Sequence, residues 1–266
     1  MKTVDFFAQE KKSMSLLGSL VRKLGGFMEI VFILLIWFAI FFYSDLLGGF
    51  GLSDMVAYLL IGNLIGLFTS FLLSKTIKFN IGHGDFKMFH YRPIFYILRV
   101  FSRTLKKIIL PFFLSISLNI TLLYFFVDSL YFNHDIRYLA LIATIIILAF
   151  VTELLLALLI DLHVFWSFES RDFFKLIMRL KKILAGAYFP LNLFGAGLLT
   201  VSLLFPFAYS FYVPTQLYLK NMSYEQGLMG LSVQLIWIAI LYFIIKISWR
   251  KKIENNKETL KREAVL

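Results

Sequence analysis

Six runs of apolar residues, each near the length that a helix needs to cross a bilayer, constrain this chain more than any other feature. They lie at residues 27–43, 55–74, 108–127, 138–160, 183–207 and 228–248. A helix needs about 20 predominantly apolar residues to cross the hydrocarbon layer, and 60% of the 266 residues are hydrophobic. Membrane-spanning β-strands would instead need short segments of alternating polarity. The pattern therefore predicts an all-α membrane protein with six transmembrane helices.

Basic residues are concentrated in four of the segments that flank these runs. All of the 27 Lys and Arg residues except Arg137 and Lys220 lie before the first run, between the second and third, between the fourth and fifth, or from Lys246 onward. Because Lys and Arg mark cytoplasmic segments, both termini are expected in the cytoplasm. The net charge of +11 then reflects topology and attraction to anionic lipid. Charge divided in this way forms no single basic face, so no nucleic-acid partner is predicted.

The connection between the second and third runs contains a motif that also occurs in proteases. Residues 82–85, Gly-His-Gly-Asp, match the Gly-x-Gly-Asp signature of intramembrane aspartyl proteases. Asp85, however, lies in the most basic cytoplasmic connection, where a carboxylate buried in the bilayer cannot be. The nearest second aspartate, Asp161, falls at the cytoplasmic end of the fourth run. The sequence therefore argues against a protease.

The same connection is predicted to contain a short helix that crosses the end of the second span. Its glycines allow sharp turns, Asp85 is a good N-cap, and Pro93 disfavours helix beyond Tyr91. Such a segment either rests on the lipid surface or presents a knob to a cytoplasmic partner. The residues themselves leave both interpretations open.

The chain divides into three parts. Apolar residues recur at helical spacing in residues 1–26, which predicts an amphipathic helix in the cytoplasmic interface. Residues 27–249 carry the six spans, and residues 250–266 form a basic cytoplasmic tail.

Two carboxylates fall within the predicted spans. A charge at the centre of a span costs about 2.5–3.5 kcal/mol on insertion scales. Glu29 begins the first span and can reach the headgroups, whereas Glu153 lies deep enough in the fourth to hydrogen-bond a neighbouring span or face a hydrated cavity. Gly62 and Gly66 in the second span form a small-xxx-small pair that permits close helix approach.

The fifth run is interrupted by residues that weaken a helix. Gly186 and Pro190 loosen its inner half, and Pro206 ends it. Residues 207–219 are apolar and aromatic but are interrupted by Pro214, so we predict a re-entrant hairpin on the outer side, at an assembly interface or exit gate. Simple anchoring of its aromatic residues in the membrane interface is the alternative. The candidate pathway or gate residues are Glu153, Gly186, Pro190, Pro206 and Pro214.

The order of these elements resembles the permease subunits of ABC transporters of the second exporter type, especially small six-span permeases that work with a separate ATPase. The resemblance rests on the amphipathic entry segment and on four stretches: GDFKMFHYRP, DLHVFW, GAYFPLNLFGAGLLTVSLLFPFAYSFYVP and VQLIWIAILYFIIKISWRKK. It implies an elbow helix at the N-terminus and a coupling helix between spans two and three that fits a cleft in the ATPase. By this resemblance the docking residues are Gly82, Gly84, Asp85, Phe86, Phe89, Arg92 and Pro93.

The resemblance also implies partners and a location. The chain has no Gly-x-x-x-x-Gly-Lys-Ser/Thr phosphate loop, so we expect that it is not an enzyme and that ATP and Mg²⁺ are bound by the ATPase. Two ABC ATPase subunits and a second permease, identical or homologous, are implied, in a bacterial plasma membrane. An ion-coupled secondary carrier and a membrane subunit that recruits or regulates a soluble partner remain as alternatives.

Overall fold

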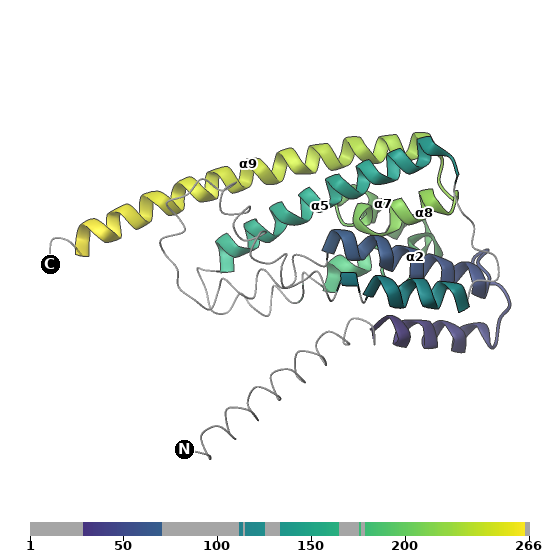
Figure 1. The fold of residues 1–266 in the computed structure, drawn as a ribbon. Coiled ribbons are helices and arrows are strands. Elements are labelled where there is room, and N and C mark those ends of the chain that lie inside the picture. The colour runs from purple at the N-terminus through teal and green to yellow at the C-terminus, as the bar shows by residue number, and fades with distance from the viewer. Residues whose placement is uncertain are drawn as a thin grey trace, which may run out of the picture.

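The computed structural model describes residues 29–70, 112–113, 115–125, 134–164, 176 and 179–263, and these residues form a helical bundle without β-strands (Figure 1). Its helices are α2 (Leu52–Ser70), α5 (Ile136–Val164), η2 (Leu191–Phe194), α7 (Gly195–Leu204), η3 (Ala208–Ser210), α8 (Tyr212–Tyr218) and α9 (Tyr224–Glu263). Two further apolar helices cover Glu29–Phe41 and Ser115–Phe125.

Three helices in the described part of the chain are long and apolar enough to cross a membrane: Leu52–Thr69, Ile136–Leu159 and Tyr224–Ser248. They coincide with the second, fourth and sixth predicted spans, and the two further apolar helices coincide with the first and third. The all-helical prediction is therefore confirmed for the described residues. The predicted N-terminal elbow and the 82–93 coupling stretch lie outside them. α9 continues to Glu263, so most of the predicted tail prolongs the last helix.

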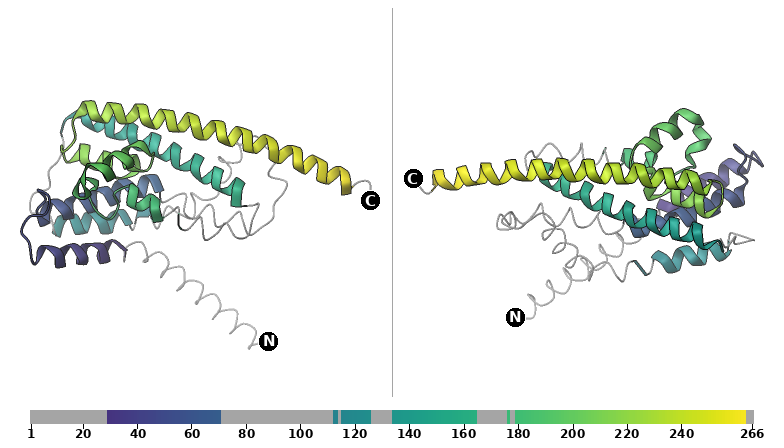
Figure 2. Two further views of the ribbon diagram at one scale, coloured as in Figure 1. Left: turned by 180° about the vertical axis from the view of Figure 1, so that it is seen from behind. Right: turned by 90° about the horizontal axis from the view of Figure 1, so that it is seen from above.

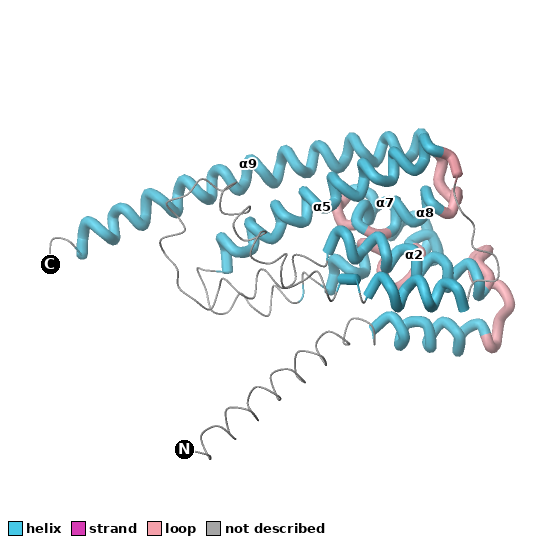
Figure 3. Tube along the Cα trace, in the orientation of Figure 1, coloured by secondary structure: helices cyan, strands magenta, loops and turns pink. Residues whose placement is uncertain are grey.

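Three loops meet at one end of the bundle, which we call the loop end: residues 42–51, 134–135 and 219–223 (Figure 3). Asp135 accepts the backbone N–H of Arg137 at 3.0 Å and so caps the start of α5. Hydrogen bonding from the Arg137 side chain lowers the pKa of this carboxyl. Tyr138 and Tyr224 meet there with ring centroids 5.7 Å apart, which joins the first turns of α5 and α9.

The fifth predicted span is not a continuous helix, and this prediction is corrected here. Helix ends at residue 184, residues 185–190 are non-helical, and α7 begins only at Gly195. Gly186 has a φ of +74°, a left-handed conformation that stops a helix. α7 has 10 residues, about 15 Å in length, which is half of what a bilayer requires.

Residues 182–193 run beside the first helix toward the loop end. Lys182 pairs with Glu29 at the start of that helix. The Trp37 indole N–H donates to the carbonyl of Tyr188 at 3.0 Å. A Cβ built on Gly48, in the loop that follows the helix, would lie 2.5 Å from a Leu193 methyl. These contacts occur in the same order along both stretches of chain, so the two segments run in parallel.

After Leu193 the chain turns back, and α7, η3 and α8 form a hairpin, here called the α7–α8 hairpin (residues 195–221), of which η3 and α8 lie inside the bundle. α7 stands out from one side of the bundle (Figure 2) and runs inward, so that the Leu204 carbonyl accepts the Trp237 indole N–H at 2.7 Å. η3 forms the deepest point, where Thr69 near the far end of α2 donates to the Ser210 carbonyl at 3.2 Å. α8 then returns to the loop end. Residues 207–219, for which a re-entrant hairpin is predicted, form the tip and most of the returning arm of this longer hairpin.

The returning arm of this hairpin is the centre of the core. Ten consecutive residues, Ala208–Leu217, are all buried, and η3 and α8 pack between α2, α5 and α9. Pro214 is the third residue of α8, where its missing N–H would have no intrahelical acceptor. The aromatic residues Tyr209, Phe211 and Tyr212 of this arm are buried in the protein, which contradicts the alternative that they anchor in the membrane interface.

Candidate functional site

A buried ion pair lies beside the tip of the α7–α8 hairpin. Glu153, in the middle of α5, binds the ammonium of Lys181, and the two side chains are only 5% and 10% exposed. Lys181 sits in the helical turn (179–184) that precedes Gly186. The pair therefore fastens the start of the broken segment to α5. Each buried charge thus has an opposite charge beside it within the protein.

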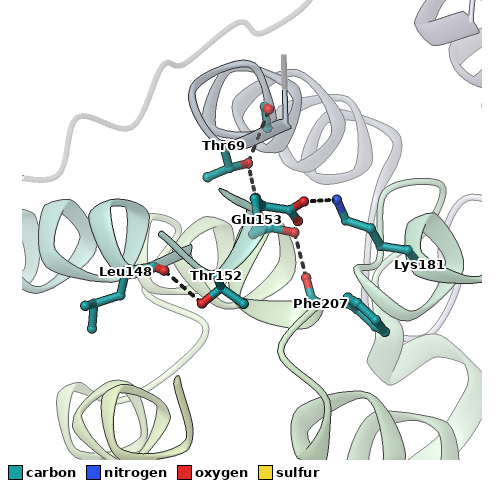
Figure 4. Close-up of polar contacts among 8 residues, drawn as sticks. Thr69, Leu148, Thr152, Glu153, Lys181 and Phe207 are labelled. Atoms are coloured by element: carbon teal, nitrogen blue, oxygen red, sulfur yellow. Dashed lines mark hydrogen bonds and ion pairs between the residues drawn. The ribbon is translucent and has the colours of Figure 1, made fainter. Parts of the chain in front are cut away.

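Two threonines, Thr69 and Thr152, lie near this pair (Figure 4). Thr69 reaches the backbone of Ser210, and the Ser210 hydroxyl donates to the Phe207 carbonyl at 2.7 Å. On α5, the Thr152 hydroxyl donates to the Leu148 carbonyl at 2.9 Å. η3 contacts both α2 and α5, so polar groups of the hairpin tip and of α2 lie close to the ion pair. Intramembrane charges of this kind are commonly functional.

A second, exposed ion pair lies one residue further along. Lys182 binds Glu29, and their side chains are 46% and 40% exposed. The Tyr188 hydroxyl donates to the same carboxylate at 3.2 Å, and the Lys182 ammonium lies 5.9 Å from the centre of the Tyr188 ring. The sequence predicts that Glu29 reaches the headgroups or the basic entry helix; the entry helix lies outside the described residues, and within them the carboxylate binds Lys182. The pair attaches residues 182–188 to the first helix.

Gly186 is fixed by two other elements. Its carbonyl accepts the buried Tyr58 hydroxyl of α2 at 2.7 Å, and the neighbouring Ala185 carbonyl accepts the backbone N–H of Tyr212 at 3.1 Å. A Cβ at Gly186 would approach the Tyr58 oxygen to 2.8 Å. Only glycine therefore combines the left-handed turn with this close contact. The turn joins α2, α8 and the segment that carries Lys181.

The three proline candidates are buried and mark ends of elements. Pro190 is the N-cap of η2. Pro206 follows Phe205, whose extended ψ of 155° is the conformation that a following proline favours, and α7 ends there. Pro214 is the third residue of α8, within its first turn. All three shape the path of the hairpin, and Glu153 lies beside its tip.

The predicted docking residues, Gly82, Gly84, Asp85, Phe86, Phe89, Arg92 and Pro93, lie outside the described residues. Their flanks are described: α2 ends at Ser70, and the next helix includes Ser115–Phe125. Asn63 of α2 donates to Asn119 of that helix at 2.8 Å. The two helices that flank the predicted docking stretch are therefore tied to each other.

Sequence reasoning missed Lys181 and Tyr58. Lys181 lies among Arg179 and Lys182, and a cluster of basic residues predicts an exposed cytoplasmic segment. Glu153 itself was the signal that could have pointed to a lysine or arginine partner, since a buried carboxylate needs a cation. Tyr58 gives no such signal, because a tyrosine within a span is common and its partner is a backbone carbonyl. Within the described residues no group of three or more His, Asp or Glu side chains could hold a metal ion.

These features place the chain in the class of polytopic membrane proteins: apolar helices of membrane-spanning length, a hairpin packed in the core and a buried ion pair. A family model described as "ABC-2 family transporter protein" matches residues 27–257. The chain therefore belongs to the ABC-2 transporter family, and it is a transmembrane permease rather than a catalytic subunit. Members of this family generally work with an ABC ATPase. Comparison with curated proteins and with solved structures gives no match.

Proposed function

We propose that this chain is the permease subunit of an ATP-driven exporter, in which it lines the translocation pathway together with a second, identical or homologous permease. Two separate ABC ATPase subunits bind ATP and Mg²⁺. The observation that carries the proposal is the family match over residues 27–257. The distribution of Lys and Arg supports a topology with both termini in the cytoplasm, and we place the chain in a bacterial plasma membrane.

The connection between α2 and helix Ser115–Phe125 is the proposed contact with the ATPase. It contains Asp85 and Arg92, which can form hydrogen bonds and ion pairs, and Phe86 and Phe89, which can fill an apolar cleft. ATP binding shifts the equilibrium between two permease conformations only if the ATPase binds this connection differently in each. The Asn63–Asn119 hydrogen bond would make the flanking helices respond together.

The buried ion pair argues against an ion-coupled carrier. A carrier that coupled transport to a proton through Glu153 would need this carboxylate free to bind and release the proton. Glu153 is instead occupied by Lys181 within the protein. We therefore interpret the pair as part of the permease's pathway wall or gate.

Purification from the native membrane in mild detergent, followed by mass spectrometry, tests this function. We expect an ATPase with a phosphate-binding loop in amounts close to those of the permeases, and the presence or absence of a second permease sequence defines the pairing. Recovery of the chain without any ATPase, even after cross-linking at Lys87, would overturn the proposal and favour a carrier or a recruitment subunit.

Arg92→Glu is expected to reduce the recovered ATPase at least tenfold, because it places a negative charge in the proposed docking segment. The matched control is Arg137→Glu. Arg137 lies at the loop end with its side chain 76% exposed, on the opposite side of the membrane in the proposed topology. Both variants are measured by quantitative mass spectrometry of the purified complex. Equal recovery of ATPase with the two variants would exclude Arg92 from the contact.

A further inference from the structure

One face of α2 is occupied by the α7–α8 hairpin and the turn that precedes it. The residues concerned are Tyr58, Gly62, Gly66 and Thr69, which recur every three or four positions and so share one side of the helix. Tyr58 donates to the Gly186 carbonyl at 2.7 Å, and Thr69 donates to the Ser210 carbonyl at 3.2 Å. These two hydrogen bonds hold the preceding turn at one end of this face and the hairpin at the other.

Between them, Phe211 fills the groove that the two glycines create. A Cβ at Gly62 would lie 2.3 Å from Cε1 of the Phe211 ring, whereas a Cβ at Gly66 would lie 3.4 Å from its Cδ2. The ring also meets Tyr58 edge to face at a centroid distance of 5.8 Å. Phe211 is only 7% exposed, so it has little room to move away. The small-xxx-small pair of α2 therefore receives a side chain of the same chain.

The opposite side of the hairpin contacts α9. A Cβ at Gly230 would lie 2.8 Å from the Tyr209 ring, and Trp237 binds the Leu204 carbonyl. α9 itself packs along α5. The hairpin is thus held between α2 on one side and the α5–α9 pair on the other. Any movement of α2 relative to that pair must displace the hairpin or break its contacts.

From these contacts we infer that the seat of Phe211 in the Gly62–Gly66 groove transmits movement of α2 to the α7–α8 hairpin, and that Gly62 and Phe211 are positioning residues for transport. The inference rests on the proposed function, because it takes the movement of α2 from an ATPase bound to the connection that follows Ser70. A helix is stiff along its axis, so a displacement at Ser70 reaches Gly62 two turns away. The hairpin is then the element that changes the pathway.

Gly62→Ala and Gly66→Ala form a matched pair that tests the inference. Both place one methyl group on the same face of the same helix. At Gly62 the methyl group collides with the Phe211 ring, whereas at Gly66 it makes an ordinary van der Waals contact. We expect both variants to assemble with the ATPase and to hydrolyse ATP at the unmodified rate. Only Gly62→Ala is expected to separate hydrolysis from movement of the hairpin.

Movement of the hairpin can be measured directly because the chain has no cysteine. A cysteine introduced at Thr200, an exposed position of α7, carries an environment-sensitive fluorophore, and the cysteine-free chain treated in parallel gives the blank. The complex purified from its native membrane is then mixed with Mg²⁺, ATP and vanadate. We expect a change in emission that Gly66→Ala preserves and Gly62→Ala reduces at least tenfold. A second variant, Gly62→Ala with Phe211→Leu, shortens the obstructed side chain and is expected to restore at least half of the change.

The outcomes distinguish failure of this inference from failure of the proposed function. If ATPase is present and the emission does not change in the unmodified complex, the hairpin does not follow α2 and the inference is wrong. The same holds if Gly62→Ala behaves as Gly66→Ala does, or if the double variant restores nothing. If Gly62→Ala prevents assembly, the double variant tests the inference by itself. Its smaller side chain at position 211 should fit beside the added methyl group and recover both assembly and the emission change. If no ATPase accompanies the unmodified chain, the proposed function itself fails.

Discussion

Lys181→Met is expected to lower the free energy of unfolding by about 3–5 kcal/mol, the range measured when one partner of a buried ion pair is removed. The substitution leaves the Glu153 carboxylate in a site that is only 5% exposed, without a cation to neutralise it. The measurement is denaturant-induced unfolding of the purified chain in one detergent, followed by tryptophan fluorescence.

The neighbouring lysine provides the control. Lys182→Met removes an ion pair whose side chains are 46% and 40% exposed, and exposed pairs contribute about 0–1 kcal/mol. The two variants make the same chemical change at adjacent positions, so their difference isolates burial. Similar losses for both would show that Lys181 reaches water and that the pair is not a buried element of the pathway.

The double variant Glu153→Gln with Lys181→Met removes both charges. It therefore separates the contribution of the ion pair to the free energy of unfolding from the cost of burying one unpaired charge. Replacing a buried ion pair by neutral groups is often nearly neutral. We therefore expect the double variant to recover most of the stability that Lys181→Met loses. If it recovers stability but loses transport, the pair is retained for function. If it retains both, the pair is dispensable and Glu153 is no longer a pathway candidate.

The positions of the long helices could be predicted from the sequence because apolar length determines them. The second, fourth and sixth spans coincide with α2, α5 and α9, and each depends on about 20 consecutive side chains that must avoid water. Local signals were informative as well: Gly186 and Pro206 do mark the ends of helices. What the sequence could not predict was the consequence of these breaks, because residues 183–207 are apolar enough to be a span.

The direction of the chain between residues 183 and 221 depends on contacts between distant positions. Trp37 with Tyr188, Thr69 with Ser210 and Trp237 with Leu204 each join residues at least 33 positions apart. Apolar periodicity contains no information on such pairs. The same limit applies to the site. Glu153 stood out because a charge within a span is costly, but its partner came from a basic cluster that looks exposed in isolation.

Gly186→Ala is expected to destabilise the chain by about 2–5 kcal/mol. A left-handed conformation costs an alanine about 1–2 kcal/mol, and here φ is +74°. In addition, its Cβ would lie 2.8 Å from the Tyr58 oxygen. The hydroxyl must then move, and a buried donor that loses its partner costs about 1–3 kcal/mol. The readout is the same denaturant unfolding.

Gly49→Ala is the control, because Gly49 also has a positive φ, of +85°, but no atom lies within 4 Å of the point that its Cβ would occupy. It should lose only the cost of the conformation, about 1–2 kcal/mol. The difference between the two variants then measures the contact with α2 rather than the backbone geometry.

Tyr58→Phe completes a double-mutant cycle with Gly186→Ala. Residues in contact couple by about 0.5–3 kcal/mol, so Gly186→Ala should cost less in the Tyr58→Phe background, where the obstructing oxygen is absent. Additive losses would show that Tyr58 does not hold the turn. A clear coupling would establish that α2 fixes the point at which the fifth segment breaks. Because the same face of α2 also holds Phe211 and Ser210, the break and the hairpin would then be governed by one helix, the one that leads into the proposed ATPase contact.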